Sequence, residues 1–336
     1  MPPTIKDIAD KLGVSTATVS RALRGLPNVA PSTRARVLQI AKDLNYSIDP
    51  RASSLASGRT MNIGIVMPLV DTWFYSKLAT AAEAMLIDSE YYVTRYNVDS
   101  LSDQTAHFRR LSNGRHVDGL IVATAALGKE DIDILNNLKV PVVTVETSTK
   151  DFASISVDNA LAAQIATRYL INLGHKRIGL ITGLQDDSMH FSVPQERLLG
   201  YHTALEEYEL EVRPELEVSG NFSLAGGAEA MIELLSVRYP PTAVFALSDE
   251  MAIGALKSIR EMNLRVPEDI SVLGFDDHDI AEYIGLTTVR QPVVDYGEKA
   301  ISMLLNLLEN PENGTHPHVK LDTQLIVRST TGPPMR

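Results

Sequence analysis

The tightest constraint on this chain lies in residues 4–25, whose pattern predicts two short helices joined by a turn. Thr4 is placed to cap the first helix, and Asp7 follows three residues later, as in a capping box. Gly13 suits the left-handed conformation that commonly follows the last turn of a helix. Apolar side chains recur at helical spacing along one face of the first helix, at Ile5, Ile8, Ala9 and Leu12.

A second and a third helix are predicted by the same criteria. We expect Ser15 to cap the second helix and Ser32 to cap the third. The inward apolar side chains would be Val14, Val19, Leu23, Val37, Ile40, Ala41 and Leu44. The outward face of the second helix would carry small, polar and basic side chains, namely Thr16, Ala17, Ser20, Arg21 and Arg24.

A helix–turn–helix with such an outward face is typical of proteins that bind DNA in the major groove. A small structural bundle is the alternative, and charge separates the two. Residues 1–60 hold nine Lys or Arg against four Asp or Glu, although the whole chain has a formal net charge of −11. A basic segment on an acidic chain favours contact with phosphates through that segment.

Residues 61–336 are long enough for two lobes of ordinary domain size. Short apolar runs predict buried strands at 63–67, 119–122, 142–145, 178–181, 243–246 and 271–275. Helical periodicity is found at 79–87 and 161–173. This alternation predicts an α/β fold with parallel sheets that helices cover on both faces, and ligands of such folds bind beyond the carboxyl ends of the strands.

Several classes of protein are disfavoured. The chain contains no Cys, so disulfides and Cys-based metal sites are excluded. No nucleotide-binding Gly motif, serine-hydrolase motif or His-Glu-x-x-His sequence occurs, and no apolar run is long enough to span a bilayer. The N-terminus leads directly into the first predicted helix, which leaves no room for a signal peptide. We therefore expect a cytoplasmic protein that is not an enzyme, carries no cofactor or metal and contacts no membrane.

The segment from Thr4 to Gly25 resembles the N-terminal signature of the lactose-repressor (LacI/GalR) family of bacterial transcription regulators. The resemblance implies a three-helix DNA-binding domain at 1–46, a hinge at 47–60, and an effector-binding and dimerisation domain at 61–336. The first lobe of that last domain would comprise about 61–158 and 291–318, and the second about 159–290 and 319–332.

The resemblance also implies roles for individual residues. Thr16, Ala17 and Arg21 would read bases, and Leu55 of the hinge would wedge into the minor groove and pry open a base step. Polar neighbours would contact phosphates or cap the helix. The DNA-binding residues expected in all are Thr4, Ser15, Thr16, Ala17, Thr18, Ser20, Arg21, Arg24 and Leu55. The hinge departs from the family's usual residues at Ile48, Asp49 and Ser53.

The resemblance continues at 115–122, 173–179, 265–277 and 286–292 and implies a two-lobed body like that of the periplasmic binding proteins. The family's cleft positions fall on Phe74, Glu146, Ser192, Arg197, Phe222, Asp249, Asp276 and Gln291. We add Trp73, which follows the first predicted strand. Carboxylates and an Arg can bond sugar hydroxyls while aromatic rings pack on sugar faces, which favours a sugar ligand. Ser248 stands where the family usually has Asn, so one expected donor is lost.

We therefore predict a homodimeric repressor that binds a near-palindromic operator in double-stranded DNA and changes affinity when a small ligand closes the cleft. A regulator that responds to a nucleoside, a purine or a sugar phosphate is the first alternative. A carbohydrate-binding transport component would account for the body, but residues 1–60 argue against it. A carbohydrate-active enzyme needs two carboxylates across a scissile bond, and no such pair can be placed from the sequence.

Overall fold

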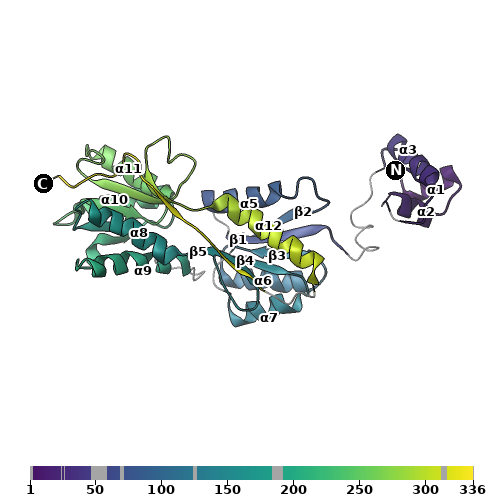
Figure 1. Ribbon diagram of the computed structural model, residues 1–336, viewed down its shortest axis with the longest axis horizontal. Coiled ribbons are helices and arrows are strands. Elements are labelled where there is room, and N and C mark those ends of the chain that lie inside the picture. Colours follow the sequence, from purple (N-terminus) through teal and green to yellow (C-terminus); the bar gives the residue numbers. More distant parts are fainter. Residues whose placement is uncertain are drawn as a thin grey trace. The chain divides into compact units, whose positions relative to one another are not determined.

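The computed structural model describes residues 3–23, 25, 27–46, 59–68, 72–123, 127–183, 192–311 and 316–335 (Figure 1). The chain forms two compact units, Met1–Met61 and Asn62–Arg336, which we call the head and the body. Two residues of the expected DNA-binding set, Arg24 and Leu55, lie outside the described residues, as does most of the expected hinge.

The head contains the three predicted helices, α1 (Ile5–Leu12), α2 (Thr16–Leu23) and α3 (Pro31–Asp43). The capping box is confirmed, because Asp7 N donates to Thr4 Oγ1 at 3.3 Å and Thr4 N donates to Asp7 Oδ2 at 2.7 Å. Gly13 has a φ of 66° and ends α1, as predicted. The small core that joins the helices is built from Ile8, Ala9, Val19, Ala22, Val37 and Ala41.

The prediction of Ser32 as the cap of the third helix is wrong. The helix begins at Pro31, and Ala30 is its N-cap without a side-chain hydrogen bond. Pro is favoured at the first helical position because its φ is already helical and it lacks the N–H that would go unpaired there. The preference of Pro31 therefore prevails over the capping ability of Ser32.

The first lobe of the body is a parallel sheet of strand order β11-β5-β4-β3-β1-β2 with helices on both faces (Figure 1). The helices α5 and α12 cover one face, and α6 and α7 cover the other. The strands are β1 (Asn62–Pro68), β2 (Tyr92–Val98), β3 (Gly119–Val122), β4 (Val142–Val145), β5 (Ala153–Val157) and β11 (His318–Leu321). The helices are α5 (Trp73–Ala84), α6 (Leu101–Ser112), α7 (Lys129–Asn137) and α12 (Val293–Glu309).

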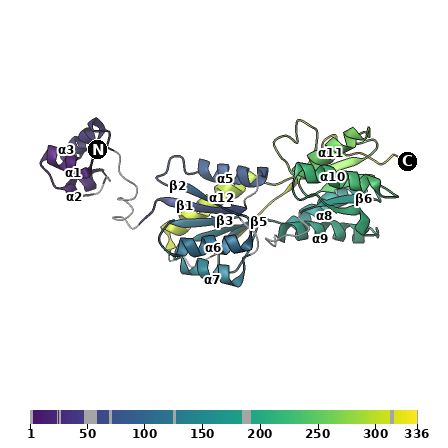
Figure 2. The same ribbon diagram turned by 180° about the vertical axis from the view of Figure 1, so that it is seen from behind.

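The second lobe is likewise a sheet covered by helices (Figure 2). Its strand order is β12-β10-β9-β8-β6-β7, in which β12 is antiparallel to its neighbour and the other pairs are parallel. Its strands are β6 (Ile178–Thr182), β7 (Glu217–Ser219), β8 (Ala243–Ala246), β9 (Ser271–Asp276), β10 (Thr287–Arg290) and β12 (Gln324–Ile326). Its helices are α8 (Asn159–Asn172), α9 (Ser192–Glu207), α10 (Leu224–Ser236) and α11 (Asp249–Glu261), with a short 3₁₀ turn at Pro214–Leu216.

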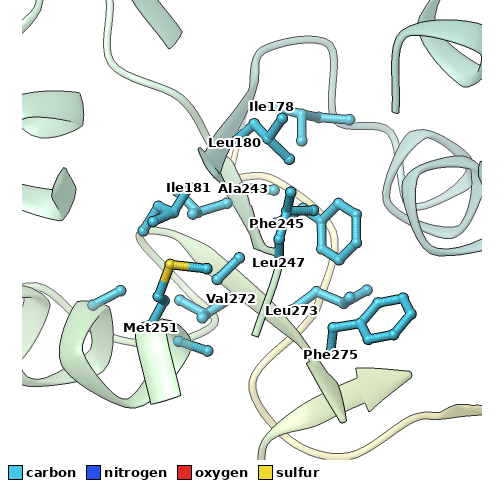
Figure 3. Packing of buried hydrophobic residues seen from close by; sticks show 14 of the residues in the cluster. Ile178, Leu180, Ile181, Ala243, Phe245, Leu247, Met251, Val272, Leu273 and Phe275 are labelled. Carbon is cyan, nitrogen blue, oxygen red and sulfur yellow. The ribbon is translucent and has the colours of Figure 1, made fainter. Parts of the chain in front are cut away.

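The core of the second lobe is a dense apolar layer between the sheet and its helices (Figure 3). Phe245 and Phe275 are completely buried in it, and Met251 reaches into it from α11. All six strands predicted from apolar runs are confirmed in the two sheets, each within a residue or so of its expected ends. Both predicted helices begin earlier than expected, α5 at Trp73 and α8 at Asn159.

The chain passes between the lobes three times: from β5 to α8, from β10 to α12, and from β11 to β12. The last passage differs from the expected boundary at residue 318, because β11 pairs with β5 as far as Leu321. These three connections are the covalent links between the two lobes. No helix among the described segments combines the length and the apolar character needed to cross a bilayer.

The helices α10 and α11 cross so closely that two glycines have no room for a Cβ. A Cβ on Gly227 would lie 2.2 Å from the carbonyl oxygen of Met251, and one on Gly254 would lie 2.0 Å from that of Leu224. Both obstacles are backbone atoms, which cannot turn aside as a flexible side chain could. The crossing therefore depends on glycine at both positions.

Gly227→Ala should lower the free energy of unfolding by about 1–3 kcal/mol, because the added methyl group forces the two helices apart. In an open helix the same change would raise stability, since Ala has the higher helix propensity. Urea unfolding of the full chain, followed by circular dichroism, measures the difference. Glu229→Ala, on the exposed side of α10, is the matched control and should stay within about 0.5 kcal/mol of the parent. A gain in stability for Gly227→Ala would contradict the close crossing.

Candidate functional site

The head presents part of the expected DNA-binding set on the surface of α2. Thr16, Ala17 and Arg21 are exposed, and Ser20 is half-buried beside them. Side chains of this kind at the start and along one face of a second helix can reach base edges in a major groove. The three residues expected to read bases therefore share an accessible surface.

Other members of that set are engaged within the head. Ser15 Oγ accepts a hydrogen bond from Thr18 N at 3.1 Å, and the two hydroxyl oxygens lie 2.9 Å apart. Thr4 is held in its capping box with Asp7. Ser15, Thr18 and Thr4 thus fix the starts of α1 and α2, which agrees with the expected capping role of Ser15.

The body encloses a cavity of about 330 Å³ between its two lobes. Its walls come from the carboxyl ends of strands and the starts of helices in both lobes, as the parallel architecture predicts. The lining residues are Thr72, Trp73, Phe74, Tyr75, Glu146, Thr147, Ser192, Val193, Pro194, Arg197, Asn221, Phe222, Ser223, Ser248, Glu250, Asp276 and Gln291.

Eight of the nine expected effector-binding residues line this cavity, and Asp249 does not. Asp249 begins α11 and is completely buried behind the wall. Its Oδ1 accepts from Thr288 Oγ1 at 2.6 Å and its Oδ2 accepts from His278 N at 2.7 Å. Burial, with Asp276 nearby, raises the pKa of Asp249 to about 8. Asp249 therefore holds the loop that follows β9 and does not line the cavity.

Among the described residues that line the cavity, Arg197 carries the one positive charge, and it is almost completely buried. Its Nε donates to Asn159 Oδ1 at 2.9 Å and its Nη1 donates to the carbonyl oxygen of Leu247 at 2.6 Å. The guanidinium lies 3.6 Å from the ring centre of Phe275. Burial lowers its pKa, and the charges of Asp276 and Glu146 act in the opposite direction. Arg197 is thus fixed in one orientation.

Glu146 follows β4 and adopts a φ of 65° that turns its side chain into the cavity wall. Tyr296 Oη donates to its Oε1, and Asn159 Nδ2 donates to its Oε2 at 2.7 Å. Burial raises the pKa of Glu146 to about 7, against the opposing effects of Asn159 and Arg197. Because Asn159 belongs to α8, this carboxylate joins the first lobe to the second.

Asp276 and Gln291 form a second polar pair. Gln291 Nε2 donates to Asp276 Oδ1 at 2.6 Å. Burial raises the pKa of Asp276 to about 6, and Arg197 limits the rise. Gln291 Oε1 is buried and has no hydrogen-bond partner among the described residues. It is an acceptor available to a hydroxyl or amino group in the cavity.

Aromatic side chains complete the wall. Trp73 and Phe74 stand at the start of α5, and Phe74 packs edge-on against Tyr296 at a centroid distance of 5.8 Å. Phe222 enters from the second lobe with a φ of 49°. Flat apolar faces beside buried carboxylates and a fixed guanidinium can hold a small polar ring by stacking and multiple hydrogen bonds. Within the described residues no group of three or more His, Asp or Glu side chains is arranged to hold a metal ion.

Sequence reasoning missed the residues that support the site. Asn159 connects Glu146 to Arg197, Tyr296 fixes Glu146, and Phe275 underlies the guanidinium. Their only signal in the sequence was position, since each lies at or near the end of a strand or the start of a helix. The lining residues that we did not predict, such as Tyr75, Asn221 and Glu250, stand next to predicted ones.

Glu146 should make stability depend on pH. Its pKa is about 7 in the folded chain and near 4.5 otherwise, so its contribution to the free energy of unfolding falls as pH rises through this window. The slope is at most about 1.4 kcal/mol per pH unit. Glu146→Gln should remove this part of the slope, measured by urea unfolding from pH 4.5 to 7.5. The variant is compared with the parent at each pH, because Asp249 and Asp276 titrate in overlapping pH ranges and contribute to both. Glu261→Gln, on the surface of α11, should leave the profile unchanged; identical slopes for Glu146→Gln and parent would show that Glu146 is not the titrating group.

Comparison with known proteins places these features in a family. Residues 4–49 match the family described as bacterial regulatory proteins, lacI family, and residues 167–331 match the periplasmic binding protein-like domain. Catabolite control protein A of Priestia megaterium is 33% identical over 98% of this chain and 100% of its own length. The transcriptional repressor CytR of Escherichia coli K12 is 33% identical over 98% of this chain and 96% of its own length.

Solved structures agree. The lac repressor dimer bound to operator and the anti-inducer ONPF superposes with a TM-score of 0.88 at 27% identity, over 99% of this chain and 100% of that one. The regulator CelR with cellobiose gives 0.71 at 30% identity over 98% and 99%. A regulator from Enterococcus faecium with bound ribose gives 0.72 at 28% identity over 81% and 99%. This chain belongs to the LacI family of DNA-binding transcription regulators, which are not enzymes.

Proposed function

We propose that this regulator is a homodimeric repressor whose affinity for its operator is switched by a small uncharged sugar bound between the lobes. The observation that carries the proposal is the cavity itself, with buried carboxylates, one fixed guanidinium and four aromatic side chains among the described residues that line it. Carboxylates and a guanidinium bond hydroxyl groups in pairs, and aromatic faces pack on the apolar faces of a sugar ring.

Size and charge narrow the class of ligand. A volume of about 330 Å³ is at the small end of ligand pockets. Among the described lining residues, the three carboxyl groups of Glu146, Glu250 and Asp276 accompany one cation, Arg197, so a phosphate or carboxylate on the ligand would meet few positive charges. The bound ribose and cellobiose of the two solved relatives support a sugar. A nucleoside is the second candidate, because Trp73 and Phe222 could stack on a base.

For the head, we propose that two copies place their α2 helices on the two halves of a near-palindromic operator. The lac repressor, solved as a dimer on its operator, supports this arrangement. Thr16, Ala17 and Arg21 would contact base edges in each half-site, and Leu55 would wedge into the minor groove between the two half-sites. Closure of the cleft would change the distance between the two hinges, so ligand and operator would affect each other's affinity reciprocally.

Arg21→Ala should weaken binding to the operator by about 1–3 kcal/mol and leave binding to random DNA nearly unchanged, because a base contact carries the sequence preference. Genomic selection of bound fragments yields the operator, and fluorescence anisotropy at one fixed salt concentration measures both affinities. Lys42→Ala, a cation on α3, is the control for loss of charge. Equal losses on operator and random DNA for Arg21→Ala would show that Arg21 only contacts phosphates.

A ligand that binds only the folded state raises the midpoint of thermal unfolding, and the rise grows with the ratio of free ligand concentration to Kd. We expect a shift with ribose, cellobiose or another uncharged sugar, and none with sugar phosphates. Phe222→Ala should reduce the affinity for that sugar at least about tenfold by removing one stacking face. Tyr239→Ala, an exposed aromatic outside the cavity, should leave it unchanged. A shift with nucleosides alone would replace the sugar by the second candidate.

A further inference from the structure

The start of α5 in the first lobe is bound to the second lobe by a group of polar contacts outside the cavity. Lys77 Nζ lies 2.9 and 3.0 Å from the two carboxylate oxygens of Asp279, and Trp73 Nε1 donates to Asp279 Oδ2 at 3.0 Å. Asp279 itself does not line the cavity. One carboxylate of the second lobe thus accepts hydrogen bonds from two side chains of the first.

Trp73 makes two more contacts with the second lobe. Its backbone N donates to Glu250 Oε1 at 3.2 Å, and its ring lies 5.1 Å from that of His278. The same Trp73 lines the cavity. Its side chain therefore belongs both to the ligand site and to the contact between the lobes.

These contacts join segments of the two lobes that are not covalently connected to each other. The segment after β1 that carries Trp73 and Lys77, and the segment after β9 that carries Asp279, are not among the three connections between the lobes. The contact at the connections is a different one, from Glu146 to Asn159 at the start of α8. A movement that separates α5 from the loop after β9 would break the bonds to Asp279 and leave the three covalent connections intact.

We propose that Asp279 is a positioning residue which, with Lys77, latches the two lobes together and fixes Trp73 in the wall of the cavity before any ligand binds. Asp279 and Lys77, with side chains 61% and 35% exposed, are accessible enough to separate without passing through the core. An isolated pair at such a surface contributes little. Here one carboxylate holds a cation and an indole together, so opening loses all three hydrogen bonds at once.

The chain contains a single Trp, so its fluorescence reports this contact without a label. In the full-length protein at pH 8, Asp279→Ala and Lys77→Met should each raise the ratio of open to closed body about three- to tenfold. The indole emission should then shift to longer wavelength and acrylamide should quench it more strongly. The matched control is Glu261→Ala, which removes a carboxylate bound to Lys257 at 2.7 Å on the same lobe.

Further variants separate a latch from a general loss of structure. Asp279→Asn keeps an acceptor for the indole but loses the charge, so its quenching should lie between those of the parent and Asp279→Ala. The double variant Lys77→Met/Asp279→Ala should show less than the sum of the two single effects, because both disrupt one contact. Unchanged emission and quenching in both single variants, with unchanged circular dichroism, would overturn the proposal, as would an equal change in Glu261→Ala.

The consequence for ligand binding rests on the proposed function. With ribose and cellobiose as probes, Asp279→Ala should weaken binding by the same three- to tenfold, since the variant must first close. If neither sugar binds the parent, the sugar proposal fails while the fluorescence result still decides on the latch. A third outcome is that Asp279→Ala exposes Trp73 but binds a sugar as tightly as the parent does. The contact with Asp279 would then not stabilise the conformation that binds the sugar.

Discussion

The buried guanidinium of Arg197 is the group around which the ligand site is organised. A charge enclosed by protein has lost its water, and it is tolerated only where fixed partners replace that water. Asn159, the carbonyl oxygen of Leu247, the ring of Phe275 and the carboxylates of Glu146 and Asp276 all contribute. These partners belong to both lobes. Because the buried guanidinium of Arg197 needs all of them in contact, it fixes the positions of several strand ends relative to one another.

The same requirement explains why the two lobes meet in a polar contact. Glu146 follows β4 of the first sheet. At the start of α8, Asn159 donates a hydrogen bond to Glu146 and accepts one from Arg197. An apolar contact at this place would be stronger but would not readily separate. Under the proposed function, hydrogen-bonded groups at this place could exchange partners with a ligand and let the lobes open and close.

Much of the fold was predictable because six strands are buried on both faces and therefore form continuous apolar runs. The strand β2 escaped prediction because it lies at a sheet edge and is mostly half-exposed or exposed, from Tyr92 to Asn97. The strands β7, β11 and β12 are partly exposed, and β10 carries Thr287, Thr288 and Arg290, so none of them forms a continuous apolar run. The position of Asp249 at a strand end was right, but sequence does not say to which side a side chain turns. Its carboxylate meets Thr288, far along the chain.

In the head, the residues that fix the helix starts are different from the residues exposed on α2, and this affects which substitutions the head can accept. Hydroxyl groups of Thr4, Ser15 and Thr18 secure the helix starts, while Thr16, Ala17 and Arg21 project from a helix whose buried side chains are Val19 and Ala22. Side chains that face water contribute little to the three-helix core. The positions that face outward on α2 can therefore be exchanged for others without loss of the three-helix fold, and under the proposed function such an exchange would alter the DNA sequence that is bound.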